Sequence, residues 1–302
     1  MNLPFQISWG KVCLLFLVLC LLVVSLACTS PSDSQPVLKV GGIPDQDTAR
    51  LARRYSIFSD YLQKELGVNV EYVPSANYAA VVTAFGQGEL QLAFFGGLTG
   101  VQARQQNPGA VAIAQRENDA VFHSKFIARA DLDLESLEDV KANAADYTIT
   151  FGSESSTSGH LMPRHFLVQT GIDPDEDFRT APSYSGSHDN TWLLVQSGSY
   201  DIGALNEEVW DRAIREGKAD PAKVKEFYTT PDYYDYNWTA QGNLDDVYGD
   251  GFTSKVQAAL FRLNPEEHGE ILELFSTEKF IETDNSNYSA IEDVARELGM
   301  IR

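Results

Sequence analysis

Short apolar runs alternate with longer amphipathic segments over most of the chain, and this alternation predicts strands followed by helices. An apolar run with period-two alternation is typical of a strand, and apolar positions recurring every three to four residues are typical of a helix. In the first part of the chain, strands are predicted over 37–42, 68–73 and 90–95, and helices over 48–66, 78–87 and 99–105. This order predicts an α/β fold in which helices cover a parallel sheet.

Polar segments follow the predicted strands, where ligands of parallel sheets bind. In the first part of the chain these segments are Asp45–Asp47, Asn77–Tyr78 and Gly96–Thr99. We therefore expect Tyr78 and Thr99 at the edge of the sheet that carries a binding site.

The apolar pattern also predicts a second lobe. Strands are predicted over 111–115 and 122–128, after which the pattern breaks between Ala128 and Asp133. A strand predicted over 224–228 would lead the chain back to the first lobe. We therefore expect two α/β lobes, the first formed by 37–128 plus 232–302 and the second by 129–231. Two crossover segments would place a ligand cleft between the lobes.

A run of hydroxyl side chains lies in the predicted second lobe. Tyr147, Ile149 and Phe151 alternate with threonines, which predicts a strand that ends at Gly152. Ser155–Ser158 follow, and an amphipathic helix begins after them. The first N–H groups of a helix have no partner within the helix, and the helix dipole is positive there, so an anion binds without lysine or arginine. Two other interpretations are an ordinary Ser/Thr N-cap and a nucleophilic serine, although the segment lacks the closing glycine of a nucleophile elbow.

The N-terminal segment is typical of an exported protein. Lys11 precedes an uninterrupted apolar run from Val12 to Val24, which is short for a membrane span and suits a signal peptide. Cys28 follows Ser25-Leu26-Ala27, as in a bacterial lipoprotein signal. We therefore predict a signal peptide over 1–27, acylation of Cys28 and a flexible tether over 28–36, with plain secretion as the alternative.

The composition of the chain argues against several kinds of site and partner. All three cysteines lie at positions 13, 20 and 28, so the predicted mature domain has no thiol for a disulfide, a metal or catalysis. The formal net charge of −20 argues against nucleic acid and anionic membrane surfaces as partners. A small anion in a cleft remains compatible, because distant surface charges are screened. No histidine pair with a carboxylate has metal-ligand spacing, so neither a metal nor a cofactor is expected.

Four segments together resemble one family. They are Phe94–Thr99, Phe151–Pro163, Ser185-Gly186-Ser187-His188-Asp189 and Pro231–Tyr236, in this order. The chain resembles the phosphate/phosphite/phosphonate substrate-binding proteins of ABC importers, and within them the putative selenate-binding subgroup. The resemblance covers nearly all of the predicted mature chain. It implies a two-lobed type II periplasmic binding protein that closes on a tetrahedral oxyanion.

The resemblance also implies site residues. The Ser-Thr-Ser that holds the anion oxygens is Ser156, Thr157 and Ser158, the tyrosine after the second strand is Tyr78, and the histidine is His188. A glutamate that holds a ligand amine in aminophosphonate binders falls at Glu207 or Glu208, and the aspartate of the return segment is Asp235. A tyrosine of phosphonate binders corresponds to Phe122, beside His123, and only one of these two can face the cleft if they alternate on a strand.

The carboxylate of Asp235 would restrict the charge of any ligand that it contacts. A carboxylate beside an anion repels it unless a proton or a cationic group lies between them. If Asp235 contacts the ligand, a protonated oxyanion or an amine is favoured over fully ionised selenate or sulfate. The same residue could instead cap a helix or belong to the hinge.

The leading hypothesis is a lipid-anchored, non-catalytic, monomeric receptor that delivers a small oxyanion to an ABC permease and its ATPase. One alternative is an exported serine hydrolase that uses Ser156 or Ser158 with His188. Another is a ligand-sensing module for a receptor kinase.

Overall fold

The computed structural model describes residues 36–302. The predicted signal peptide, Cys28 and the predicted tether up to Gln35 lie outside the described residues. Between residues 36 and 302, no helix is both long and apolar enough to span a membrane.

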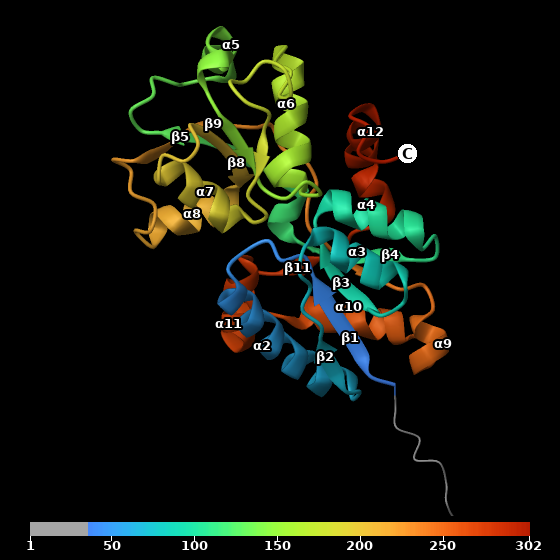
Figure 1. Cartoon of the computed structure of the whole chain (residues 1–302). Coiled ribbons are helices and arrows are strands. Elements are labelled where there is room, and N and C mark those ends of the chain that lie inside the picture. The colour runs from blue at the N-terminus through green and yellow to red at the C-terminus, as the bar shows by residue number, and fades with distance from the viewer. Residues whose placement is uncertain (1–35) are drawn as a thin grey trace, which may run out of the picture. The chain divides into compact units, whose positions relative to one another are not determined.

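The first lobe is built on a mixed sheet of six strands (Figure 1). Their order across the sheet is β11 (Phe280–Ile281), β4 (Val111–Arg116), β10 (Asn237–Ala240), β3 (Leu92–Phe95), β1 (Leu38–Gly42) and β2 (Val70–Tyr72). The strands β1, β2 and β3 are parallel, as predicted, but β10 runs antiparallel to β3 and β4. The prediction of a parallel sheet therefore holds for β1, β2 and β3, whereas β10 is antiparallel because the chain re-enters this sheet from the second lobe in the opposite direction.

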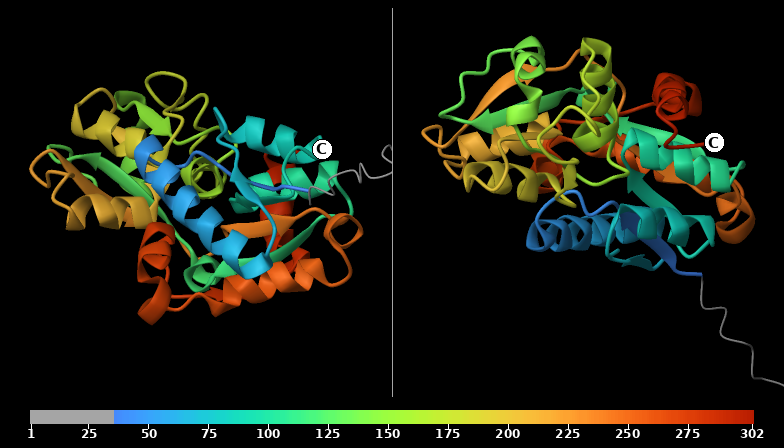
Figure 2. Two further views of the ribbon diagram at one scale, coloured as in Figure 1. Left: turned by 90° about the horizontal axis from the view of Figure 1, so that it is seen from below. Right: turned by 45° about the horizontal axis from the view of Figure 1, so that its top comes forward.

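Within residues 36–302, seven helices and one 3₁₀ turn belong to the first lobe, and several of them follow directly on strands of its sheet. They are α2 (Thr48–Leu66), α3 (Tyr78–Gly86), α4 (Gly97–Gln106), α9 (Leu244–Tyr248), α10 (Phe252–Arg262), α11 (Pro265–Phe275) and α12 (Ser289–Glu297), with a 3₁₀ turn η4 (Asn285–Tyr288). The right-hand view of Figure 2 shows α12, in red beside the C-terminus, next to the teal α4, and the two helices are in contact. The Asp47 carboxylate caps α2 by accepting hydrogen bonds from Ala49 N and Arg50 N.

The second lobe is built on a mixed sheet of five strands. Their order is β7 (Ser183–Tyr184), β6 (Ile149–Phe151), β8 (Ile202–Asn206), β5 (Ser124–Arg129) and β9 (Val224–Thr229). Its helical segments are α5 (Leu137–Ala142), η2 (Ala144–Asp146), η3 (Thr157–Leu161), α6 (Met162–Thr170), α7 (His188–Gln196) and α8 (Glu207–Arg215).

The alternation of side chains along these strands explains the two cores of this lobe. Phe126 of β5 packs in the cluster with α5 and α6, whereas its neighbour Ile127 packs in the cluster with α7 and α8. The sheet is therefore covered by helices on both faces.

The chain passes between the sheets twice. The first passage runs from Arg116, the end of β4, through the 3₁₀ turn η1 (Glu117–Val121) to Ser124, the start of β5. The predicted crossing between Ala128 and Asp133 was wrong, because β5 pairs with β8 and β9 of the second sheet. An apolar strand carries no local signal that tells which of two sheets it joins. The second passage runs from Thr229 to Asn237, and Phe122 pairs there with Tyr233 across the two crossing segments.

Candidate functional site

The N-termini of two helices from different lobes meet at one point. The backbone N–H of Leu98, in the first turn of α4, donates to the Thr157 hydroxyl at 3.0 Å. The preceding N–H of Gly97 donates to the Asp235 carboxylate at 2.9 Å. Thr157 begins η3 in the second lobe, so the positive ends of both helices are directed to the same buried region.

The predicted hydroxyl run lies in this region and is buried. Ser156, Thr157 and Ser158 expose only 2%, 2% and 1% of their surface. Ser156 serves as the N-cap, because its hydroxyl accepts a hydrogen bond from Gly159 N at 3.0 Å. The first turn after it is a wider π-helical turn, a feature that is frequent at functional sites. The N-cap interpretation is therefore confirmed for Ser156, and Thr157 and Ser158 stay candidates for the anion site.

Buried Asp45 Oδ1 forms no hydrogen bond with any residue in 36–302, but it faces Arg54 Nη1 at 3.7 Å. Two further buried oxygen atoms of the site also form no hydrogen bond with these residues. They are the Tyr78 hydroxyl and the Asp235 Oδ2 atom, and both residues expose 1% of their surface. Burial raises the pKa of Tyr78 well above its ordinary value, so its hydroxyl stays protonated and can donate. Burial also raises the pKa of Asp235 to about 7, against the hydrogen bond from Gly97 N. Buried polar groups normally have partners, so both atoms are available to a ligand.

His188 is fully buried at the start of α7. Its Nδ1 atom accepts a hydrogen bond from Asn206 N at 3.3 Å, so the proton of the neutral ring lies on Nε2. Burial lowers the pKa of His188 to about 4, so the ring is neutral near pH 7. A methyl group on Gly159 would come within 2.9 Å of the His188 ring, which shows how closely the ring packs against the hydroxyl-bearing turn.

The Tyr236 hydroxyl connects residues that sequence reasoning had not brought together. It donates to the Asp45 carboxylate at 3.1 Å and accepts from the Asn206 side chain at 2.9 Å. The Asp45 carboxylate also lies 3.7 Å from Arg54 Nη1, and Asp45 O accepts a hydrogen bond from His188 N. The position of Asp45 after the first strand was the only sequence signal for its place here.

Four predicted residues do not join the hydroxyl run. Glu207 pairs with His123, with 3.0 Å between the Glu207 carboxylate and His123 Nδ1, and both side chains are partly exposed. The Phe122 ring is buried and packs edge-on against the rings of Tyr233 and Tyr236. The Thr99 hydroxyl is buried and donates to Gly96 O in its own helix turn.

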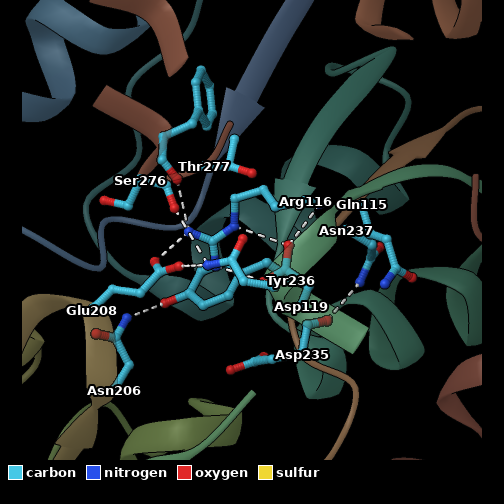
Figure 3. Close-up of polar contacts among 12 residues, drawn as sticks. Gln115, Arg116, Asp119, Asn206, Glu208, Asp235, Tyr236, Asn237, Ser276 and Thr277 are labelled. Atoms are coloured by element: carbon cyan, nitrogen blue, oxygen red, sulfur yellow. Dashed lines mark hydrogen bonds and ion pairs between the residues drawn. The ribbon is translucent and has the colours of Figure 1, made fainter. Parts of the chain in front are cut away.

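Glu208 contacts the first lobe. Figure 3 shows Arg116 between the carboxylates of Asp119 and Glu208, with the Tyr236 ring beside it. The Arg116 guanidinium lies 4.5 Å from the centre of the Tyr236 ring. Burial, together with the nearby Asp119 charge, raises the pKa of Glu208 to about 8 against the opposing effect of Arg116. This cluster lies at the start of the first crossing, and its Arg116 guanidinium packs against the Tyr236 ring.

The hydrogen bonds of the hydroxyl run and of Tyr78, His188 and Asp235 within residues 36–302 include none from lysine or arginine. No group of three or more His, Cys, Asp or Glu side chains in this part of the chain is arranged to hold a metal ion. The site can therefore hold an anion through neutral donors, and a proton between the anion and Asp235 fits its chemistry.

Two mixed α/β sheets joined by two crossings, with this buried polar site between them, define a type II periplasmic binding protein. Within this class the chain belongs to the family described as "ABC transporter, phosphonate, periplasmic substrate-binding protein", whose profile matches residues 40–288. Members of this family bind substrates and do not transform them, so this chain is not an enzyme. It is a periplasmic component of an ABC importer.

Similar proteins share most of the chain's length. The chain is 42% identical, over 91% of its length and 94% of the relative's, to "Probable ABC transporter phosphite binding protein PhnD1" of Prochlorococcus marinus. A solved structure of that PhnD1 in complex with methylphosphonate covers 88% of this chain and 99% of its own, with a TM-score of 0.84 and 41% identity. The "Phosphate-import protein PhnD" of Mycolicibacterium smegmatis is 27% identical over 68% of this chain and 69% of its own.

Proposed function

We propose that this protein captures a small phosphorus oxyanion that keeps an acidic hydrogen, such as phosphite or methylphosphonate. The anion binds between the lobes and is delivered to the permease and ATPase of an ABC importer. Ser156, Thr157, Ser158, Tyr78 and His188 act as donors, and Asp235 contacts the acidic hydrogen. The similarity to the phosphite-binding PhnD1 and to its complex with methylphosphonate supports this ligand class.

One observation carries the proposal: a buried carboxyl group with a free oxygen lies beside neutral donors at two helix N-termini. The donors favour an anion, whereas an ionised Asp235 repels one. A ligand with an acidic hydrogen satisfies both, because that hydrogen is shared with Asp235 Oδ2. Sulfate and selenate have no such hydrogen near neutral pH, so they would place two unshielded negative charges side by side.

The predicted selenate-class ligand is therefore the less favoured member of the proposed set. Phosphate keeps an acidic hydrogen near neutral pH, as phosphite and methylphosphonate do. Charge alone does not separate these three ligands, and the fit of the fourth substituent on phosphorus would determine their order.

Calorimetric titration of residues 36–302 tests the proposal. We expect phosphite or methylphosphonate to bind at least about tenfold more tightly than sulfate and selenate, which corresponds to ~1.4 kcal/mol. Absence of binding by both phosphorus ligands, or a preference for sulfate or selenate, would contradict it. No ester hydrolysis is expected, because the His188 ring bonds to Asn206 N and its pKa is too low for a general base near neutral pH.

We also propose that acylated Cys28 attaches the protein, as a monomer, to the outer face of the cytoplasmic membrane. The tether over 28–36 would let the binding unit reach the permease. Fractionation of cells that express the Cys28→Ser variant tests this attachment. We expect the variant in the soluble exported fraction and the unaltered protein in the membrane fraction; soluble unaltered protein would indicate plain secretion.

A further inference from the structure

One face of helix α8 in the second lobe contacts the first lobe through Glu208, whose side chain is 10% exposed, and through the buried Arg212. Glu208 and Arg212 lie four residues apart, so they project from the same side of the helix. Glu208 accepts hydrogen bonds from Arg116 and Asn118, which belong to the first crossing (Figure 3 shows the contact with Arg116). The Arg212 guanidinium donates to the Gln46 side chain at 2.7 Å. Other residues of α8, including Val209 and Ala213, pack into their own lobe's core.

The contact of Arg212 lies next to the ligand site without being part of it. Gln46 follows Asp45, whose carbonyl accepts a hydrogen bond from His188 N at 3.0 Å. The Asp189 carboxylate accepts from Asp47 N at 2.9 Å and lies 3.5 Å from Arg212. The loop after β1 is thereby attached at three points, two at the N-terminal end of α7 and one at Arg212 in the last turn of α8.

Arg212 and Gln46 are buried only while the two lobes lie against each other, so their contact depends on the position of the lobes. Arg212 exposes 5% of its surface and Gln46 also exposes 5%, although each would be hydrated if the lobes separated. A buried guanidinium is costly unless its donors are used, and Gln46 supplies the acceptor from the opposite lobe. Arg212 keeps Asp189 as a partner within its own lobe, so the second lobe does not need Gln46 for its own folding.

We propose that the Glu208–Arg212 face of α8 is a latch that holds the lobes closed over the ligand without contacting the ligand. Glu208 contacts the first crossing, and Arg212 contacts the loop that carries Asp45. This inference rests on the proposed function, because the latch acts on the closure that follows ligand binding. Arg212 and Gln46 are thus positioning residues that determine how long a bound ligand is retained.

A double-mutant cycle across the lobe boundary tests the latch. Gln46→Ala, Arg212→Met and the double variant are compared by methylphosphonate affinity and by stopped-flow dissociation rate. Each single variant is expected to release ligand about five- to fiftyfold faster, and the double variant to be no worse than the more affected single variant. The ratio of phosphite to methylphosphonate affinity should stay unchanged, because neither residue contacts the ligand.

Arg215→Met is the matched control, since Arg215 lies on the same helix and is exposed. In the double variant of Arg215→Met with Gln46→Ala, the effects of the two substitutions on methylphosphonate affinity and dissociation rate should be independent of each other. Additive effects of Gln46→Ala and Arg212→Met on ligand affinity would overturn the latch. So would a coupling that appears only in the thermal stability of the ligand-free protein, because the contact would then persist when the lobes open.

Interlobe energy transfer separates failure of the latch from failure of the proposed function. Residues 36–302 contain no cysteine, so Lys64→Cys on α2 and Glu138→Cys on α5 can carry a dye pair. We expect methylphosphonate to change the transfer in the unaltered background and a smaller closed fraction in the Arg212→Met background. If no ligand binds, the proposed function fails; the latch is then judged by the closed fraction without ligand, and equal fractions in both backgrounds overturn it.

Discussion

The hydroxyl of Thr157 accepts a hydrogen bond from the backbone N–H of Leu98 at 3.0 Å, although the two residues belong to different lobes. The contact joins the first turn of α4 to that of η3. Each helix start has N–H groups without a partner in its own helix. The contact therefore places two sets of such donors beside Asp235, and the proposed anion site needs no lysine or arginine.

Replacing Thr157 by valine tests the contribution of its hydroxyl. Thr157→Val keeps the shape but removes an oxygen that the ligand and Leu98 N would otherwise use. We expect a loss of ~1.5–3 kcal/mol in binding, or about ten- to a hundredfold in affinity, measured by calorimetry. Thr170→Val is the control, because that hydroxyl bonds only to Phe166 O at the end of α6. Equal ligand affinities of the two variants would show that the Thr157 hydroxyl does not contribute to binding.

Asp235→Asn should change the pH dependence of binding and of stability. The pKa of Asp235 is raised to about 7, so in the unaltered protein affinity for an anion should fall as the pH rises through about 7 and the carboxylate ionises. The folded protein also holds more protons than the unfolded chain between about pH 4 and 7, so Asp235 lowers stability progressively as the pH rises through that window.

Both proteins are titrated with ligand at each pH. Ionisation of the ligand affects both affinities equally, so it cancels in their ratio. The ratio of their affinities should change across pH 7, and denaturant unfolding should show a flatter pH profile for Asp235→Asn between about pH 4 and 7. A constant affinity ratio would show that Asp235 does not titrate beside the ligand.

His188→Gln should make the protein less sensitive to acid. The folded-state pKa of His188 is lowered to about 4, so acidification from about pH 6.5 favours the unfolded chain, which binds the proton. The loss amounts to at most ~1.4 kcal/mol per pH unit. His160, whose pKa burial also lowers to about 4, contributes a similar loss, so His188→Gln should remove only part of the slope. Urea unfolding at several pH values measures it, and an unchanged slope would contradict the burial of a neutral ring.

Gly96→Ala should weaken binding by crowding the junction of the lobes. An added methyl group would lie 3.1 Å from the Thr157 hydroxyl and 3.2 Å from Asp235 Oδ1. Closure would have to shift these atoms, so we expect at least about a tenfold loss of affinity, with a smaller change in the ligand-free melting temperature. Gly269→Ala on α11 meets no atom within 4 Å and should bind normally. Unaltered affinity of Gly96→Ala would mean that the lobes close less tightly at this point.

The site was predicted from the sequence only where local signals mark it. The hydroxyl run could be recognised because a strand, a glycine and an amphipathic helix surround it. Tyr78 and His188 each begin a helix next to a polar segment. Glu207 and His123 gave equally good local signals, and they pair with each other instead of contacting the hydroxyl run. Asp45 and Tyr236 were named only as parts of polar segments, and their contact was not predicted, since they lie 191 residues apart and their hydrogen bond has no local pattern.

The sequence by itself determined the alternation of strands and helices, the hydroxyl-bearing helix start and the absence of cysteine after position 28. These follow from hydrophobic periodicity and from backbone groups that need partners nearby in the chain. Only the tertiary structure decided that β5 joins the second sheet, that Asp45, Tyr236 and Asn206 converge, and that α8 docks on the first lobe. Such pairings depend on contacts between distant segments, which form only when both lobes have folded and met.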